Sequence, residues 1–152
     1  MSHNVRLNGV KFANLNTLKA AVQELRNEGA NIELVEGTGL IARAFGAGAS
    51  DVPCDVLLRV NDGQWDVGFK LNERGEYIPE LESMFRHRHL SATGNEAPVE
   101  GCRVDYGGIQ IGQLTQRYAL VQAEINAAQA GYSTTRTYDS AKRQFQLEVR
   151  AG

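Results

Sequence analysis

The sequence has few residues of the types that most often build covalent cross-links and metal centres. Its 152 residues include two cysteines, Cys54 and Cys102, and three histidines. The start, "MSHNVRLNGV", lacks the apolar core of a signal peptide. We therefore expect both cysteines to be buried, reduced thiols, with a disulfide or a metal role as the alternatives.

Long apolar runs and an excess of charge of one sign are also missing. No stretch is apolar enough to cross a bilayer, so no membrane association is expected. The formal net charge is −2, which argues against a general nucleic-acid binder, because such a protein needs a surface that neutralises phosphates. The expected location is the cytoplasm.

What is present is the composition of one ordinary soluble domain, 42% hydrophobic and 22% charged. Apolar residues recur at helical spacing over 14–29, where Asn14 or Asn16 can cap the start and Gly29 suits the stop, and again over 114–131. Strands are expected at 5–12, at 31–36, and in hairpins across 54–80 and 132–149. We expect a single α+β domain in the order β-α-β-β-β-α-β-β, with a mainly antiparallel sheet of about six or seven strands and two helices on one face.

Two segments are predicted to be loops. Residues 91–101, "SATGNEAPVEG", are polar and rich in turn-forming residues, so an exposed loop is expected there. Residues 37–53, "GTGLIARAFGAGASDVP", combine glycines with three large apolar side chains, Leu40, Ile41 and Phe45. Burying three such side chains does not offset the entropy of ordering the segment, so we expect this loop to be ordered by contact with another chain.

Several short pieces together resemble a known family. They are Ser2-His3, the helix with Leu18, Ala21 and Leu25, the run "WDVGF" from Trp65 to Phe69, and "LTQRYALVQAEINAAQAGY" from Leu114 to Tyr132. The resemblance is to the uncharacterised family called hypothetical chloroplast reading frame thirty-five, or domain of unknown function twelve fifty-seven, of plastids, cyanobacteria and some phages. It implies an α+β fold and a bacterial, phage or plastid origin, and it implies no activity. The segment 37–53 and the residues between Glu82 and Gly112 lie outside the resemblance.

Four groups of residues invite a chemical interpretation. His87-x-His89 would place two ligands on one side of a strand, but Arg86 and Arg88 would repel a cation, so no metal site is expected. "GTG" (37–39) and "GAG" (46–48) do not continue into a phosphate-binding motif. The acids flanking the hairpin turns are more typical of solubility than of acid–base catalysis; they are Asp62, Asp66, Glu73 and Glu76. Ser2-His3 has no acid nearby to complete a triad.

The functional hypothesis is therefore a non-enzymatic protein-interaction or assembly module that binds other subunits or its own copies. A phage-encoded assembly or virion component fits this class, as does an accessory subunit of a bacterial complex. The expected partner-binding residues are Leu40, Ile41, Phe45 and Gln116, and no cofactor is expected. Gln116 is polar and matches the family, so it either contacts a partner or satisfies a buried backbone group. The alternative is a small enzyme or ligand-binding protein with a site near the Gly-rich segment that uses Asp66, His87 or His89.

Overall fold

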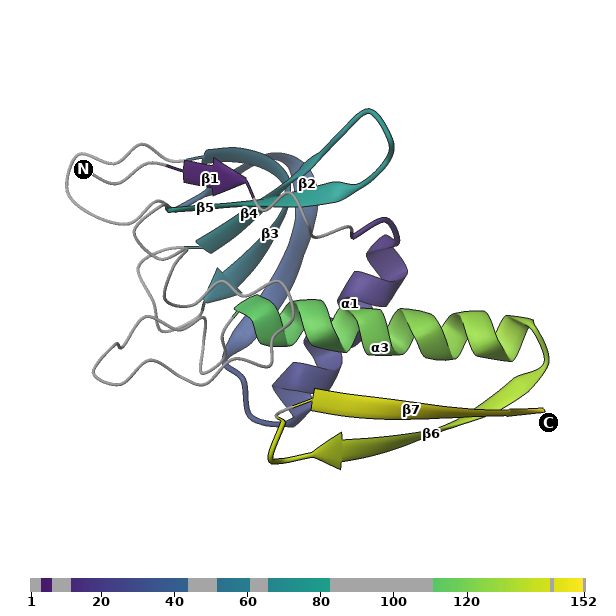
Figure 1. Cartoon of the computed structure of the whole chain (residues 1–152). Coiled ribbons are helices and arrows are strands. Elements are labelled where there is room, and N and C mark those ends of the chain that lie inside the picture. Colours follow the sequence, from purple (N-terminus) through teal and green to yellow (C-terminus); the bar gives the residue numbers. More distant parts are fainter. Residues whose placement is uncertain are drawn as a thin grey trace.

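The computed structural model describes residues 4–6, 12–43, 52–60, 66–82, 111–142 and 144–151, and the α+β class is confirmed. Two helices and seven strands occur in these ranges (Figure 1): β1 (Asn4–Arg6), α1 (Leu15–Asn27), β2 (Ile32–Ala42), β3 (Val52–Val60), β4 (Asp66–Leu71), β5 (Tyr77–Glu82), α3 (Ile111–Gln129), β6 (Tyr132–Asp139) and β7 (Gln144–Ala151). The predicted loop at 91–101 and the two histidines at 87 and 89 lie outside the described residues.

Helix α1 begins and ends where its sequence predicts. The Asn14 side chain accepts a hydrogen bond from the Thr17 backbone N–H at 3.2 Å, which satisfies one of the free donors of the first turn. The chain leaves the helix through Gly29, whose φ of 106° is accessible to glycine at little cost. The apolar stripe of α1, from Leu18 to Leu25, is buried against the sheet.

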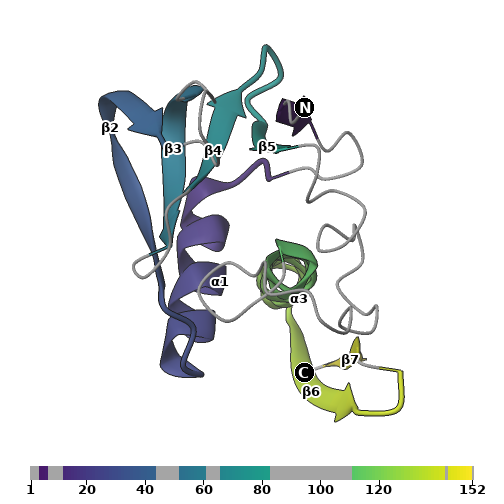
Figure 2. The same ribbon diagram turned by 90° about the vertical axis from the view of Figure 1, so that its left-hand side faces the viewer.

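The main sheet has five antiparallel strands in the order β1-β5-β4-β3-β2. Val56 pairs with Phe69 and Leu58 with Val67, so these four side chains share the face that α1 covers. Phe12 lies at the centre of this core, with its ring edge-to-face on Phe69 at 5.6 Å and on Tyr118 of α3 at 4.9 Å. Both helices lie on the same side of this sheet (Figure 2).

The Gly-rich segment differs from its prediction. Strand β2 continues through Gly37 and Gly39 to Ala42, and Leu40 to Ala42 pair with residues 52–54 of β3. The register shifts between Glu36 and Leu40, where Gly39 takes a φ of 68°. The loop prediction is therefore wrong for 37–42 and 52–53, because a bulge lets a glycine-containing strand keep its pairing; residues 44–51 lie outside the described part.

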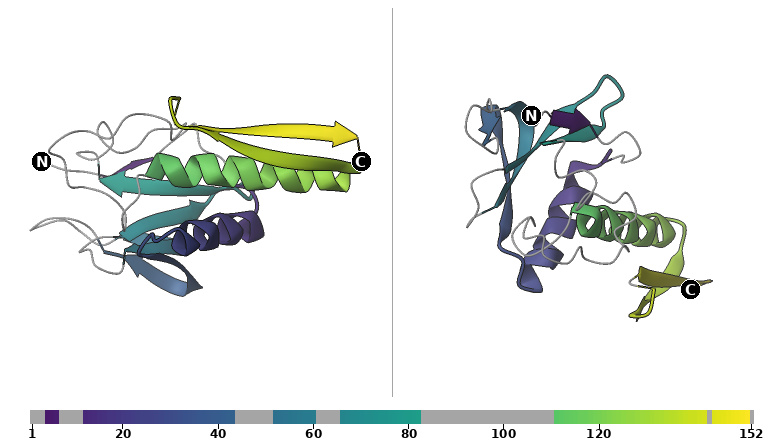
Figure 3. Two further views of the ribbon diagram at one scale, coloured as in Figure 1. Left: turned by 90° about the horizontal axis from the view of Figure 1, so that it is seen from below. Right: turned by 60° about the vertical axis from the view of Figure 1, so that its left-hand side comes forward.

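The last two strands are separate from the main sheet. Residues 132–139 and 144–151 pair as an antiparallel hairpin that is its own two-stranded sheet. The expectation of one sheet of six or seven strands is thus corrected to five strands and two, because α3 lies between the hairpin and the rest. In two views, the C-terminal half of α3 and the hairpin extend beyond α1 and the five-stranded sheet (Figures 1 and 3). We call α3, β6 and β7 the C-terminal arm.

Neither helix of the described residues is both long and apolar enough to span a membrane.

Candidate functional site

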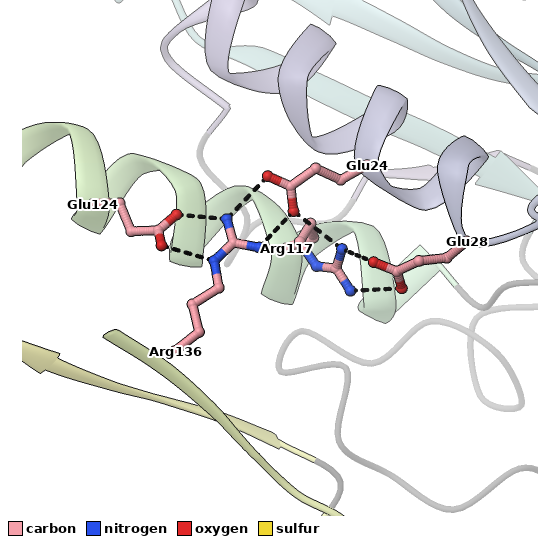
Figure 4. Close-up of polar contacts among 5 residues, drawn as sticks. All are labelled: Glu24, Glu28, Arg117, Glu124 and Arg136. Atoms are coloured by element: carbon pink, nitrogen blue, oxygen red, sulfur yellow. Dashed lines mark hydrogen bonds and ion pairs between the residues drawn. The ribbon is translucent and has the colours of Figure 1, made fainter. Parts of the chain in front are cut away.

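Five charged side chains meet where the C-terminal arm joins α1 (Figure 4). Glu24 of α1 and Glu28, the C-cap residue just after that helix, are one turn apart, so both point to the same side. Arg117 and Glu124 come from α3, and Arg136 comes from β6. We call these five residues the arginine clamp.

Arg117 is the buried member of the clamp, with 5% of its surface exposed. Its Nη2 donates to Glu28 Oε1 at 2.9 Å, and its Nη1 donates to Glu28 Oε2 and, at 3.1 Å, to Glu24 Oε1. The guanidinium carbon lies 4.8 Å from the centre of the Phe145 ring of β7. Paired carboxylates and a π face together compensate the lost hydration of the charge. The Nε atom is buried and has no hydrogen-bond partner among the described residues.

Arg136 joins three elements. Its Nη1 and Nη2 donate to the two oxygens of Glu24 at 2.7 and 2.9 Å. Its Nε and Nη2 donate to the two oxygens of Glu124 at 2.7 and 2.5 Å. The planar guanidinium of arginine can make two such forked contacts at once, whereas the single ammonium of lysine cannot. Arg136 therefore ties β6 to both α1 and α3.

The clamp holds its groups in their charged forms. Hydrogen bonds from Arg136, and then charge attraction and bonds from Arg117, lower the pKa of Glu24 below its usual 4.5. The Arg117 hydrogen bonds lower the pKa of Glu28 in the same direction, and those to Glu124 and Glu24 raise the pKa of Arg136. Carboxylates with lowered pKa values are poor proton donors near pH 7. The clamp joins α1, α3 and β6 through ion pairs. Since it has three carboxylates and two guanidiniums, it has no excess positive charge to attract an anion.

The hairpin that the clamp fixes is only partly covered. Alternation along β6 and β7 puts Arg136, Phe145 and Leu147 on the face toward α3. On that same face, Tyr132, Tyr138 and Val149 remain 47%, 53% and 50% exposed. The opposite face is polar. These exposed side chains make this face of the hairpin the candidate contact surface of the described residues.

The predicted partner residues are not gathered on one surface in the described structure. Leu40 is half-buried against Ala42, Cys54 and Leu57, whereas Ile41, beside it on β2, is 48% exposed. Gln116 lies half-buried on α3. The contacts of α3 are chiefly with α1, β6 and β7, whereas those of β2 are chiefly with β3 and α1. Phe45 lies outside the described residues.

Asp66 is paired with Arg43 inside the fold. Its side chain is fully buried, and it accepts bonds from Arg43, the residue just after β2: backbone N–H at 3.0 Å, Nε at 3.0 Å and Nη2 at 2.7 Å. The Asp66 backbone N–H returns a bond to the Arg43 carbonyl at 2.9 Å. These contacts hold the end of β2 against the start of β4.

The other residues considered for catalysis or metal binding are not gathered into one site among the described residues. Glu73 is exposed in the β4–β5 turn, and Glu76 accepts a bond from Asn72 Nδ2 at 3.0 Å. Cys54 is buried, which raises the pKa of its thiol. Among the residues described, no cluster of three or more His, Cys, Asp or Glu side chains is placed to hold a metal ion. The remaining candidates lie outside the described residues; they are Ser2, His3, Asp62, His87, His89 and Cys102.

The clamp itself was missed by sequence reasoning. The spacing of Glu24 and Glu28 shows that they share a helix face, but no local pattern indicates that their partners are Arg117 and Arg136. Those partners are 89 to 112 residues away.

No family model, curated protein or solved structure matches the chain. The family resemblance therefore stays an expectation, and the geometry of the arm and its clamp is the basis for a functional proposal.

Proposed function

We propose that the chain is a non-enzymatic interaction module that binds other protein subunits, its own copies included, through the C-terminal arm. The observation that carries the proposal is the half-exposed set Tyr132, Tyr138 and Val149 on a two-stranded sheet. A two-stranded hairpin is marginally stable by itself, so one that carries exposed apolar side chains gains from a further partner.

The clamp supports this proposal because it pre-organises the surface. Arg136 fastens β6 to both helices, and Arg117 supports Phe145 of β7. A surface that is already rigid loses less conformational entropy when it binds, which leaves more of the contact energy for affinity. The clamp groups are paired with one another and charged, which suits a support better than proton transfer.

The residues expected from the sequence to bind a partner or a substrate are mostly engaged within the chain itself. Leu40 packs into the chain's own interior, so it is not proposed as a contact residue, and Ile41 remains only a peripheral candidate. Asp66 is engaged by Arg43, so it is not proposed as the acid of a small enzyme with a site near the Gly-rich segment. A phage-encoded assembly or virion component, or an accessory subunit of a bacterial complex, is a setting that fits this class of module.

The test measures binding of the full chain to defined proteins. The tagged chain is titrated against an untagged copy and against the products of adjacent genes, one pair at a time. Replacing Tyr138 and Val149 together with Ser should weaken the bound pair roughly tenfold or more, because truncated aromatic anchors cost most at interfaces.

A matched control changes the opposite face of the same hairpin. Thr137→Ala with Gln146→Ala alters a cross-strand pair on the polar face and should leave binding unchanged. The proposal fails if no pair binds, or if every pair that binds is indifferent to the Tyr138/Val149 substitutions.

A further inference from the structure

We propose that one partner of the arm is a second copy of the chain, which pairs its β7 edge antiparallel with β7 and forms a four-stranded sheet in the order β6-β7-β7-β6. This inference rests on the proposed function, since it names the occupant of the same surface. Within the described residues β6 and β7 pair only with each other, so each has an edge whose backbone donors and acceptors face away from the hairpin.

The two edges are not equally open. Among the described side-chain contacts, β6 meets α1 directly, through Arg136 and Glu24, whereas β7 meets it only through Arg117 of α3. Figure 2 shows the same arrangement, with α1 beyond β6 and with β7 on the other side of the hairpin. A strand added to β6 would run toward α1, whereas a strand added to β7 extends the sheet away from it.

The sequence of β7 is complementary to itself in one register. When a two-fold axis passes beside Val149, Val149 faces Val149 of the second copy and Leu147 faces Ala151. On the polar face, Glu148 then faces Arg150 of the second copy, and the symmetry repeats this pair. Both side chains are accessible, at 58% and 68% exposed, and their ion pair with each other at 2.8 Å in the single chain would be exchanged for the pairs between copies.

Neighbouring registers lack this match. An axis beside Glu148 places that carboxylate against its own copy, and an axis beside Arg150 does the same for the guanidinium. An axis beside Leu147 pairs Glu148 with Gln146 and makes no charge pair. The charges therefore select the Val149 register and discourage the addition of unrelated strands.

The pairing also covers what the single chain leaves exposed. Val149 would be covered at the axis, and the added strands would give the hairpin the three or more strands that an independent sheet needs. One short strand from each copy makes a small interface, so we expect a reversible dimer.

The experiment uses charge reversal in the full chain, with mass in solution measured by sedimentation over roughly 1 µM to 1 mM. Glu148→Arg alone puts arginine against arginine, and Arg150→Glu alone puts glutamate against glutamate. Each single variant should dimerise roughly tenfold or more weakly than the wild type. An equimolar mixture of the two should restore the dimer, because every cross-strand pair is then of opposite charge, and the double variant should dimerise like the wild type.

A control variant tests whether the copies pair through the β6 edge instead. Thr137 lies on β6, faces the same side of the hairpin as Glu148 and pairs with Gln146, so Thr137→Arg should leave a β7 dimer unchanged and break a β6 dimer. Wild-type protein that stays monomeric at the highest concentration overturns the inference, as does a dimer lost in Thr137→Arg or indifferent to the Glu148 and Arg150 variants. A monomer that still binds another subunit through Tyr138 and Val149 overturns this inference alone and leaves the proposed function standing.

Discussion

Arg117 carries a full positive charge in a place where water reaches little of it. The Glu28 carboxylate, the Glu24 carboxylate and the Phe145 ring replace the lost water from three directions. Such a group contributes less to stability than its number of contacts suggests, since desolvation opposes the attraction. Removing the Arg117 guanidinium is nonetheless costly, because the carboxylates of Glu24 and Glu28 then lose the positive charge that compensates their own.

We predict that Arg117→Met lowers the free energy of unfolding by about 1–3 kcal/mol, less than a fully buried pair would cost because Glu28 can turn to water. Urea unfolding at pH 7 measures the change. Lys19→Met is the matched control: Lys19 and Glu36 form an exposed pair, which should contribute below about 1 kcal/mol. Equal effects of the two substitutions would mean that Arg117 has no special structural role.

Glu24 gives the clamp a pH dependence with a definite sign. Its folded pKa lies below the usual 4.5, chiefly because Arg136 bonds the ionised form. The unfolded chain therefore binds more protons in acid, so the stability from Glu24 is present above pH 4.5 and is lost as the pH falls through the lowered folded pKa.

Glu24→Gln should consequently lose less stability than the wild type between pH 5 and pH 3, roughly the window below the ordinary pKa of a glutamate. The urea midpoint, measured at each pH for both proteins, checks this. Parallel curves would show that Glu24 has the same pKa in the folded and unfolded chain.

Gly68 marks a close approach between strands. A Cβ atom there would lie 3.2 Å from the Cβ atoms of both Ala42 and Cys54. Since Cβ atoms are fixed to the backbone, the strands must shift to admit a methyl group. We predict that Gly68→Ala destabilises the fold by about 1–3 kcal/mol in thermal or urea unfolding.

Gly37→Ala provides the comparison on β2. Its added methyl group would meet only the Leu40 side chain at ordinary contact distance, 3.5 Å at the nearest, and should be tolerated. If Gly68→Ala is tolerated equally well, the β2–β4 approach is looser than the distances indicate.

At the scale of elements, the local patterns predicted well what local forces decide. The apolar stripe and cap of α1, Gly29 with its positive φ just past that helix, and the β6–β7 hairpin all agree with the structure. The continuation of β2 was not predictable from composition, because its stability comes from pairing with β3 across a bulge. The clamp was missed for a related reason, since its partners are distant in the sequence.

If a partner ordered residues 37–42, substitutions there would hardly affect the stability of the monomer. For strand β2 we predict the opposite. Leu40 packs against Ala42, Cys54 and Leu57 within one chain, so Leu40→Ser should destabilise a demonstrated monomer by about 2–4 kcal/mol. Ile41→Ser, one residue away and largely exposed, should cost below about 1 kcal/mol. Urea unfolding of the monomer compares them, and a reversed order would restore the docking role for this segment.

At the scale of the whole molecule, the chain is a body of sheet and α1 with an arm attached along α3. Apolar contacts join the two near the start of α3, where Leu114 and Tyr118 enter the main core. The Tyr118 hydroxyl accepts a bond from the Asn14 backbone N–H at 2.9 Å, and Thr17 Oγ1 donates to Gln122 at 2.8 Å. These contacts are between helices, so the position of the hairpin depends on α3 and the clamp.

Removing Arg136 should therefore loosen the hairpin while leaving the body intact. In Arg136→Met, Glu24 and Glu124 face each other without their shared cation, and β6 loses its forked bonds to both helices. We predict that amide exchange across 132–151 rises roughly tenfold or more, whereas exchange in β3 and β4 stays as in the wild type, because regions held by few contacts open independently of the core. Arg136→Lys should recover little, since one ammonium cannot form both forks. Lys142→Met, a charge removed from the exposed turn of the same hairpin, should change nothing. If exchange in β3 and β4 rises with that of the hairpin, arm and body unfold as one cooperative unit, and the clamp stabilises the whole fold without a separate effect on the arm.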